Sequence, residues 1–455
     1  MRRLIAGVVL ALVATAAACT PSRGALFGPV RDSIVQRTGV EPDWRADWRR
    51  SPRADQRVRD LLAEPLTADS AVAIAILGNA ELQAAYEELG IAGGALASAH
   101  TPPNPHAEAE LRFPLDEGET QLEFSVVESV TGLLTLIPKH RAADAELRAA
   151  RRNAIAATLA VAARARTAYY HAAAAEQILG FRRTIAEAAA ASAELARSLR
   201  VAGNITELEL AREELFEEEA SLAVREAEAE AVGAHERVNA ALGLYGHEAS
   251  WRITAALPDA PDDAPAADAL EREAVAASLG LEAQRWRIEA AGHRIGVARL
   301  ESFVPDLGAG VAAKREGDWG AGPVVSLSIP LFDWGQGKRA TAWAELRRAQ
   351  HEYTSMAVDL RAQARAWQAR LAAAHERAVR FKTVVLPLHE RLLAEAVRQY
   401  NAMNQSPFEL LVVRREQVEA QARYIEALRD YWVAITGVEQ LRAGALPAPA
   451  SEGSP

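Results

Sequence analysis

The chain repeats the same order of predicted elements about 200 residues later, and this duplication constrains its fold more than any single motif. Asn204 corresponds to Asn404 in the second copy, and Glu209 corresponds to Glu409. The offset is 200 in both cases (404 − 204 and 409 − 209). Two copies of one structural unit are therefore expected, with matching turns at matching positions.

Each predicted repeat consists of an opening helix, a β-hairpin and a long helical hairpin. The first repeat is predicted at residues 67–257 and the second at 258–443. The expected elements are, in chain order, a helix at 69–99, a β-hairpin at 106–131, a helical hairpin at 139–245, a helix at 267–302, a β-hairpin at 307–331 and a helical hairpin at 338–442.

The two β-hairpins are indicated by apolar residues at every second position, which is the period of a strand with one apolar face. Short polar connectors at 116–119 and 315–318 separate the strands of each pair. The alternating sets are Ala107, Ala109, Leu111 and Phe113, then Leu122, Phe124 and Val126, then Leu307, Ala309, Val311 and Ala313, then Val325, Leu327, Ile329 and Leu331. The sequence therefore predicts four strands.

The long helices are too long for an ordinary globular domain. Residues 139–202 and 339–403 are rich in Ala, Glu, Arg and Leu, which favour helix. About 64 residues give a rod of about 96 Å. Returning helices are predicted at 206–242 and 407–441, and apolar residues recur there every seven positions, as in a coiled coil. These seams are Leu208, Leu215 and Leu222 in the first copy, and Leu411, Val418, Ile425 and Trp432 in the second.

Four strands cannot close a membrane barrel alone, because the smallest such barrels need about eight. An open sheet edge in lipid leaves backbone groups without hydrogen bonds, so the edges are expected to pair with further copies of the chain. Two copies would give a barrel of eight strands whose interior side chains fill it, whereas three give twelve and leave a conduit. We expect a mostly α protein with a small β part, assembled as a trimeric twelve-stranded barrel continued by an α-helical barrel.

The N-terminus has the layout of a secretory signal, which we predict to span residues 1–18. Arg2 and Arg3 precede an apolar stretch, and small residues lead to Cys19, the single cysteine of the chain. This arrangement resembles a bacterial lipobox, in which the cysteine thiol carries a fatty acyl chain such as palmitate. A cleaved signal followed by an incidental cysteine is the alternative. Residues 19–66 are predicted to form an extended lipid-anchored arm, and 444–455 a disordered tail.

Net charge and the spacing of glycines and histidines argue against several classes of function. A net charge of −10 argues against nucleic acid as a partner, and it fits either a cation-favouring acidic lumen or plain solubility. The glycine spacing of 333–338 differs from that of a phosphate-binding loop, and a strand-to-helix turn explains it. The ten histidines are scattered and form no zinc motif. No enzyme activity, cofactor or metal site is therefore predicted.

The mature chain resembles the TolC-like outer-membrane efflux family over residues 66–443. The motifs that carry the resemblance are Pro103-Asn104 before the first strand, Ile329-Pro330-Leu331-Phe332-Asp333-Trp334-Gly335-Gln336-Gly337 before the second long helix, and Tyr400 with Ser406-Pro407-Phe408-Glu409-Leu410-Leu411 at the second turn. The resemblance implies a homotrimer in the outer membrane with a large periplasmic part. It also implies a passive conduit that docks to a periplasmic adaptor and an inner-membrane transporter.

The resemblance further implies that acidic residues at the helical-hairpin turns ring a periplasmic aperture. Glu409 matches such a position, and Glu207 and Glu209 mark the other turn. Val412 stands where a second acidic residue is frequent in the family. The alternative is that all three glutamates simply favour the start of a helix. The stretch 132–139 departs from the usual family motif, and similar stretches occur in some metal-associated members of the family. The resemblance therefore favours metal ions or small molecules as the expected cargo.

A periplasmic coiled-coil adaptor lipoprotein is the rival hypothesis, because adaptors also carry helical hairpins. An adaptor would have one hairpin flanked by β modules. Two helical hairpins, each following a strand pair, favour the channel.

Overall fold

The computed structural model describes residues 21–45, 47, 49–113, 120–253, 256–316 and 318–447 of the 455-residue chain. The predicted signal peptide, Cys19, the connector 116–119 and the predicted tail beyond 447 lie outside the described residues. The described chain divides into two compact units, of which unit 1 holds residues 21–33, 84–155 and 279–358, and unit 2 holds 34–83, 156–278 and 359–447. Among the described helices, none combines the length and apolar character needed to cross a membrane.

Unit 1 contains one antiparallel sheet in the order β1-β2-β3-β4. The strands are β1 (His106–Arg112), β2 (Gln121–Ser129), β3 (Gly308–Glu316) and β4 (Asp318–Ser326). The central pairing of β2 with β3 joins the two repeats, with Val127 opposite Gly310. Gly310 allows this pairing, because a Cβ there would collide with the backbone carbonyl of Val126. The four predicted strands are confirmed.

The last strand is shorter than predicted. Alternation of apolar residues continues through Leu331, but β4 ends at Ser326. Ser326 pairs with Gly308, the first residue of β3, so the chain beyond it has no strand to pair with in this sheet. Leu327 and Ile329 are therefore exposed outside the sheet.

The first long helix begins earlier than predicted. It is α6 (Val130–Val201), which starts directly after β2 rather than at Lys139. The Ser129 side chain accepts a hydrogen bond from the Gly132 N–H at 3.0 Å and so caps the helix start. The Thr131 hydroxyl donates to the Val304 carbonyl at 2.7 Å and accepts from the Leu307 N–H at 3.0 Å, which ties the start of α6 to the second repeat.

Both opening helices are broken where single helices were predicted. The first forms α4 (Ala68–Gly78) and α5 (Ala80–His100), and the second forms α8 (Leu270–Ala277) and α9 (Leu279–Phe303). Asn79 explains the first break, because its buried side chain accepts from the Glu81 N–H at 2.8 Å and donates to the Ala241 carbonyl at 2.9 Å. A polar side chain satisfied in this way replaces the helical hydrogen bonds that are lost.

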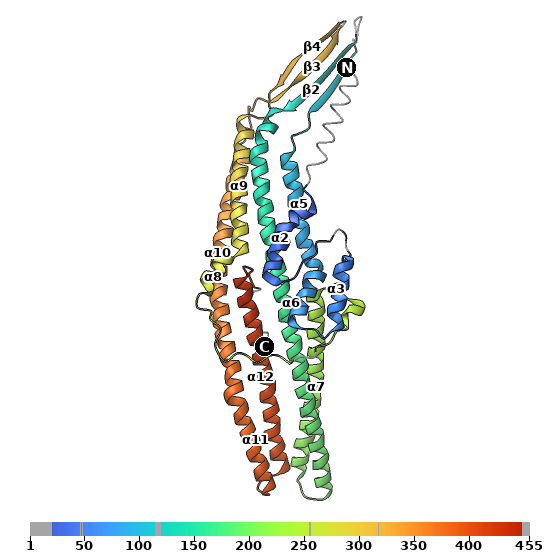
Figure 1. Ribbon diagram of the computed structural model, residues 1–455, viewed down its shortest axis with the longest axis vertical. Helices are drawn as coiled ribbons and strands as arrows, with labels where there is room; N and C mark the ends of the chain where they lie inside the picture. Colours follow the sequence, from blue (N-terminus) through green and yellow to red (C-terminus); the bar gives the residue numbers. More distant parts are fainter. Residues whose placement is uncertain are drawn as a thin grey trace. The chain divides into compact units, whose positions relative to one another are not determined.

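The remaining long helices follow the prediction closely. They are α7 (Glu207–Leu242), α10 (Gln336–Arg380), α11 (Leu386–Asn401) and α12 (Pro407–Arg442). A π turn, η2 (Phe381–Val385), separates α10 from α11. It ends two residues before Pro387, which has no N–H to donate within a helix. Figure 1 shows α11 and α12 side by side as a helical hairpin.

The N-terminal arm is helical, which corrects the prediction of an irregular extended segment. It forms α2 (Arg23–Thr38) and α3 (Pro52–Ala63). Pro52 occupies the first turn of α3, where its missing N–H costs nothing, and Ser51 caps that helix. In unit 1 the Phe27 ring packs on Tyr86 with centroids 4.9 Å apart, which fixes the start of α2 on α5.

The two predicted coiled-coil seams behave differently. The seam of α12 packs within unit 2, where Val418 joins Ile185, Ala189 and Ala220 in one buried cluster. The stripe of α7 does not pack within the chain: Leu208, Leu215 and Leu222 are 62%, 59% and 59% exposed. The contact between α6 and α7 is formed by other residues, among them Ala189 of α6 and Ala220 of α7. The three leucines therefore face outward from the single chain.

The turn after α11 holds a methionine in the left-handed region. Met403 has φ 59°, and Gly203 has φ 73° at the corresponding turn of the first copy. We expect Met403→Gly to raise the free energy of unfolding by about 0.5–1 kcal/mol, because glycine adopts this φ without steric strain. Met403 is 94% exposed, so no packing is lost. Thermal unfolding measures the effect, and Gly203→Ala should lower stability by a similar amount.

His171 on α6 makes unit 2 sensitive to acid. Burial, and then the nearby Arg429 and Arg237, lower the pKa of His171 to about 4, although Asp430 and Glu230 oppose the shift. The unfolded chain takes up a proton near pH 6.5 and the folded chain does not, so stability falls as pH drops from 6.5 toward 4.

Replacing His171 with leucine should remove this part of the acid sensitivity. Between pH 7 and pH 4.5, the free energy of unfolding of the wild type should fall by about 2 kcal/mol more than that of His171→Leu. Denaturant unfolding at the two pH values measures both. The exposed His351 provides a matched control, and His351→Leu should behave as the wild type does. Equal losses in all three proteins would show that His171 titrates normally.

Candidate functional site

The predicted aperture residues lie at two turns of unit 2. Glu207 and Glu209 begin α7 after the turn from α6, and Glu409 begins α12 after the turn from α11. Figure 1 shows both turns at the same end of the helical hairpins. The structure therefore places all three glutamates at hairpin tips, as the duplication predicted.

Two of these glutamates complete matching capping boxes. The Thr206 side chain accepts from the Glu209 N–H, and the Glu209 carboxylate accepts from the Thr206 N–H at 2.7 Å. In the second copy the Glu409 carboxylate accepts from the Ser406 N–H at 2.8 Å. Hydrogen bonds from Thr206 hold the pKa of Glu209 below its usual range. Both carboxylates thus stabilise a helix start, and the negative charges are fixed at the turns.

Glu207 has a different partner. Its carboxylate accepts from the Arg200 guanidinium at 3.1 Å, across the turn between α6 and α7. Both side chains are largely exposed, so this ion pair contributes little to stability. It neutralises Glu207, and Glu209 and Glu409 remain as the stronger negative positions.

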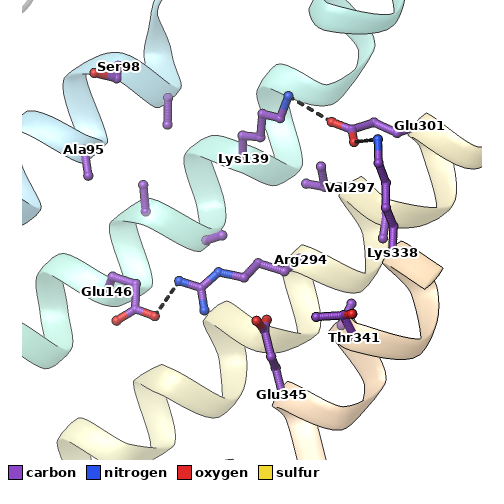
Figure 2. A pocket seen from close by; sticks show the side chains of 15 residues that line it. Ala95, Ser98, Lys139, Glu146, Arg294, Val297, Glu301, Lys338, Thr341 and Glu345 are labelled. Carbon is purple, nitrogen blue, oxygen red and sulfur yellow. Dashed lines mark hydrogen bonds and ion pairs between the residues drawn. The ribbon is translucent and has the colours of Figure 1, made fainter. Parts of the chain in front are cut away.

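Unit 1 contains a cavity of about 760 Å³ lined by α5, α6, α9 and α10. Its walls are mostly apolar, with the buried alanines Ala142, Ala298 and Ala342 among them. Small side chains at these positions keep the helices close without filling the space between them. Figure 2 shows charged side chains from three of the four helices gathered around this apolar surface.

Five of the charged side chains around the cavity form two ion-pair groups. The Glu301 carboxylate of α9 lies 3.2 Å from the Lys139 ammonium of α6 and 3.4 Å from that of Lys338 on α10. Arg294 of α9 donates to Glu146 of α6 at 2.8 Å (Figure 2). These pairs link three helices of unit 1, and with the Glu345 carboxylate, which also lines the cavity, the rim carries three positive and three negative charges. Within the described residues, no group of three or more His, Cys, Asp or Glu side chains is placed to hold a metal ion.

Comparison with known proteins gives one curated relative and a set of solved structures. No family model matches the sequence. The cobalt-zinc-cadmium resistance protein CzcC of Cupriavidus metallidurans is 25% identical over 389 residues, which are 83% of this chain and 90% of CzcC. This similarity extends over both repeats rather than over one motif.

Solved outer-membrane channels have the same fold. The channel OprN superposes with a TM-score of 0.69 at 18% identity, covering 91% of this chain and 96% of OprN. The Campylobacter jejuni channel CmeC gives 0.67 at 15% identity, covering 84% of this chain and 86% of CmeC. The chain has the fold of the TolC-like outer-membrane efflux channels. The family resemblance drawn from the sequence is confirmed.

The comparisons bear on the two hypotheses that the sequence left open, a channel and an adaptor. The adaptor alternative is not favoured, because the solved structures that superpose on this chain are outer-membrane channels. The similar solved proteins are described as outer-membrane channels. The mostly helical composition with one small antiparallel sheet agrees with the predicted fold class.

Sequence reasoning located the turns of this TolC-like chain but missed the cavity of unit 1. The turns are local, so the capping motifs Thr206-x-x-Glu209 and Ser406-x-x-Glu409 signal them directly. The cavity is formed by residues of four helices that are distant in sequence, with no shared motif.

Proposed function

We propose that this chain is the outer-membrane channel of a tripartite efflux system and that three copies close one pore. The observation that carries this proposal is the incomplete sheet. Among the described strands, β1 pairs only with β2 and β4 pairs only with β3, so both outer edges are open. All residues of β1 are exposed, on both faces of the strand.

Open edges of this kind require partners. A backbone N–H or carbonyl without a hydrogen bond in lipid costs several kcal/mol, and a membrane sheet must therefore close on itself. Pairing the β4 edge of one copy with the β1 edge of the next gives twelve strands in three copies. Twelve antiparallel strands are an even number, as in bacterial barrels, and leave an interior wider than eight strands do.

Exposed apolar stripes on the helical hairpins support the same assembly. The heptad stripe of α7, Leu208, Leu215 and Leu222, has no partner among the described residues of its own chain that buries it. A second stripe runs along η2 and α11, where Val384, Leu388 and Leu392 are also exposed. Contact between the α7 stripe of one copy and the α11 stripe of the next would bury both, as in a coiled coil.

The partners and location follow from this role. The channel sits in the outer membrane with a large periplasmic part and connects to a periplasmic adaptor and an inner-membrane transporter. Acylation of Cys19, for example by palmitate, adds a lipid anchor after removal of residues 1–18. The names of the similar outer-membrane channels support the proposed location, and the signal-like sequence before Cys19 supports the lipid anchor.

A divalent transition metal is the proposed cargo class, with other small molecules as the second candidate. The similarity to CzcC, which is named for cobalt, zinc and cadmium resistance, favours metal ions. Growth of a channel-deleted strain on graded zinc, cobalt and cadmium, with and without this chain, tests the cargo. Rescue on a small-molecule toxin but on no metal would favour the second candidate.

We expect Glu409 to contribute to cation preference at the periplasmic aperture, and Glu409→Gln separates this role from capping. Glutamine still accepts the Ser406 N–H, so the helix start is kept while the charge is removed. The expected result is a several-fold lower cation-to-anion permeability ratio with an unchanged melting temperature. Glu209→Gln, with the same capping geometry, is the matched variant for the other turn. A lower melting temperature with unchanged permeability would assign Glu409 to capping alone.

Planar-bilayer recording of the purified full-length protein tests the channel itself. We expect discrete current steps from protein that migrates as a heat-modifiable trimer in mild detergent. Membrane-extracted protein that gives no current and runs as a single chain would overturn the proposal and favour the adaptor.

A further inference from the structure

We propose that His100 and His140 together bind a divalent transition-metal ion in unit 1. His100 is the last residue of α5, and His140 lies near the start of α6. Their ring centroids are 5.1 Å apart and the ring planes meet at 60°. The two imidazoles therefore come from different helices and lie close together where α5 ends.

The distance between the rings fits joint coordination of one ion. Imidazole nitrogens bind zinc at about 2.0–2.1 Å, which places each ring centroid about 3.2 Å from the metal. At a tetrahedral angle, two such centroids are separated by about 5.2 Å. The observed 5.1 Å matches this value, so the spacing of the two rings permits both to bind one ion.

His140 also has a buried nitrogen that lacks a partner. Its Nδ1 is shielded from solvent and makes no hydrogen bond in the described structure. Buried polar atoms are ordinarily satisfied, and one that is not calls for an explanation such as a bound ion. A metal ion at His140 would give this nitrogen a partner, whereas the contact with the His100 ring does not.

The surroundings determine which ions would bind and how tightly. Imidazole suits zinc, copper, nickel and cobalt and is a poor ligand for magnesium and calcium. The described residues offer no group of three or more His, Cys, Asp or Glu side chains, so water completes the coordination. Two protein ligands with water give weaker binding than a closed four-ligand site and allow the ion to exchange.

The site also lies beside the cavity of unit 1. Ala99 and Lys139, the chain neighbours of the two histidines, line that cavity. The Glu301 carboxylate pairs with Lys139 and offsets its positive charge next to the pair of imidazoles. The inference does not depend on the cargo of the channel, because it concerns what these two side chains bind.

Cobalt titration of the full-length trimer in detergent, after removal of bound metal, tests the proposal. We expect one Co²⁺ per chain, seen as visible absorption of the bound ion, and competition by Zn²⁺ but not by Mg²⁺. His100→Ala and His140→Ala should each weaken binding at least ten-fold. His351→Ala, at an exposed histidine of the same unit, should bind as the wild type does.

Replacing one metal-binding side chain with another distinguishes loss of the site from misfolding of the variant. His140→Cys keeps one imidazole and supplies a thiolate, so we expect Co²⁺ binding to persist with an added sulfur-to-cobalt absorption band. Equal binding by the wild type and the double alanine variant would overturn the proposal, as would a His140→Cys spectrum without sulfur coordination. Bilayer currents of the same proteins report on the channel separately, so failure of the metal site and failure of the channel are distinguishable.

Discussion

Replacing Leu208, Leu215 and Leu222 together with glutamine is expected to destabilise the assembled protein strongly while leaving the single chain folded. The three leucines form one stripe of α7, and each is about 60% exposed in the chain. Burying that surface in a neighbouring copy stabilises by about 1–2 kcal/mol per leucine. Nine leucines in a trimer give on the order of 10 kcal/mol, before the cost of ordering the interface.

The measurement is the temperature at which the trimer dissociates in mild detergent, together with far-ultraviolet circular dichroism of the dissociated chain. We expect a dissociation temperature lower by tens of degrees and unchanged helicity. Val418→Gln is the contrasting variant, because Val418 is buried within its own chain and its loss should reduce helical stability directly. An unchanged dissociation temperature for the triple variant would show that the α7 stripe faces solvent in the assembly.

Gly310→Val is expected to prevent formation of the barrel. Gly310 lies opposite Val127 in the pairing that joins the two repeats, and a Cβ there would overlap the Val126 carbonyl. The clash is with backbone, so no side-chain rotation relieves it, and β2 and β3 must separate. We expect little or no heat-modifiable trimer in outer membranes, measured by gel mobility with and without heating.

Gly320→Val is the matched control for this substitution. Gly320 lies in β4 of the same sheet, and among the described residues of the chain nothing lies within 4 Å of the position its Cβ would take. The same change of side chain should leave the trimer intact there, or strengthen the strand through the β preference of valine. Trimer yields that fall equally for both variants would point to a general effect of valine in this sheet rather than to close backbone approach.

The parts of the fold that could be predicted are those specified by local sequence. The turns at Gly203 and Met403 lie 200 residues apart, and both adopt positive φ, so the duplication fixed their geometry as well as their position. Period-two alternation located the strands, although it overran the end of β4 at Ser326. Alternation records which face of a segment is apolar, whereas the end of a strand depends on where its neighbour stops.

The errors in the prediction arise from tertiary contacts. Asn79 breaks the opening helix because its amide reaches the Ala241 carbonyl, 162 residues away. The N-terminal arm is helical rather than extended because Phe27 packs on Tyr86, and because Pro52 starts a helix instead of ending one. Proline alone does not show on which side of it a helix lies.

The candidate site was also predictable only where short local motifs specify it. The positions of Glu207, Glu209 and Glu409 at helix starts follow from short capping motifs. Which of two heptad stripes packs inside the chain could not be read from spacing, because Leu215 and Val418 show the same period. The pairing of His100 with His140 depends on how α5 and α6 approach each other, and nothing in the sequence near either residue indicates it.

Native mass spectrometry of the protein extracted from outer membranes in mild detergent tests the central claim most directly. Closure of an open four-stranded sheet by three copies predicts a particle of three chains. A particle of one or two chains would contradict that account, because neither leaves a twelve-stranded barrel.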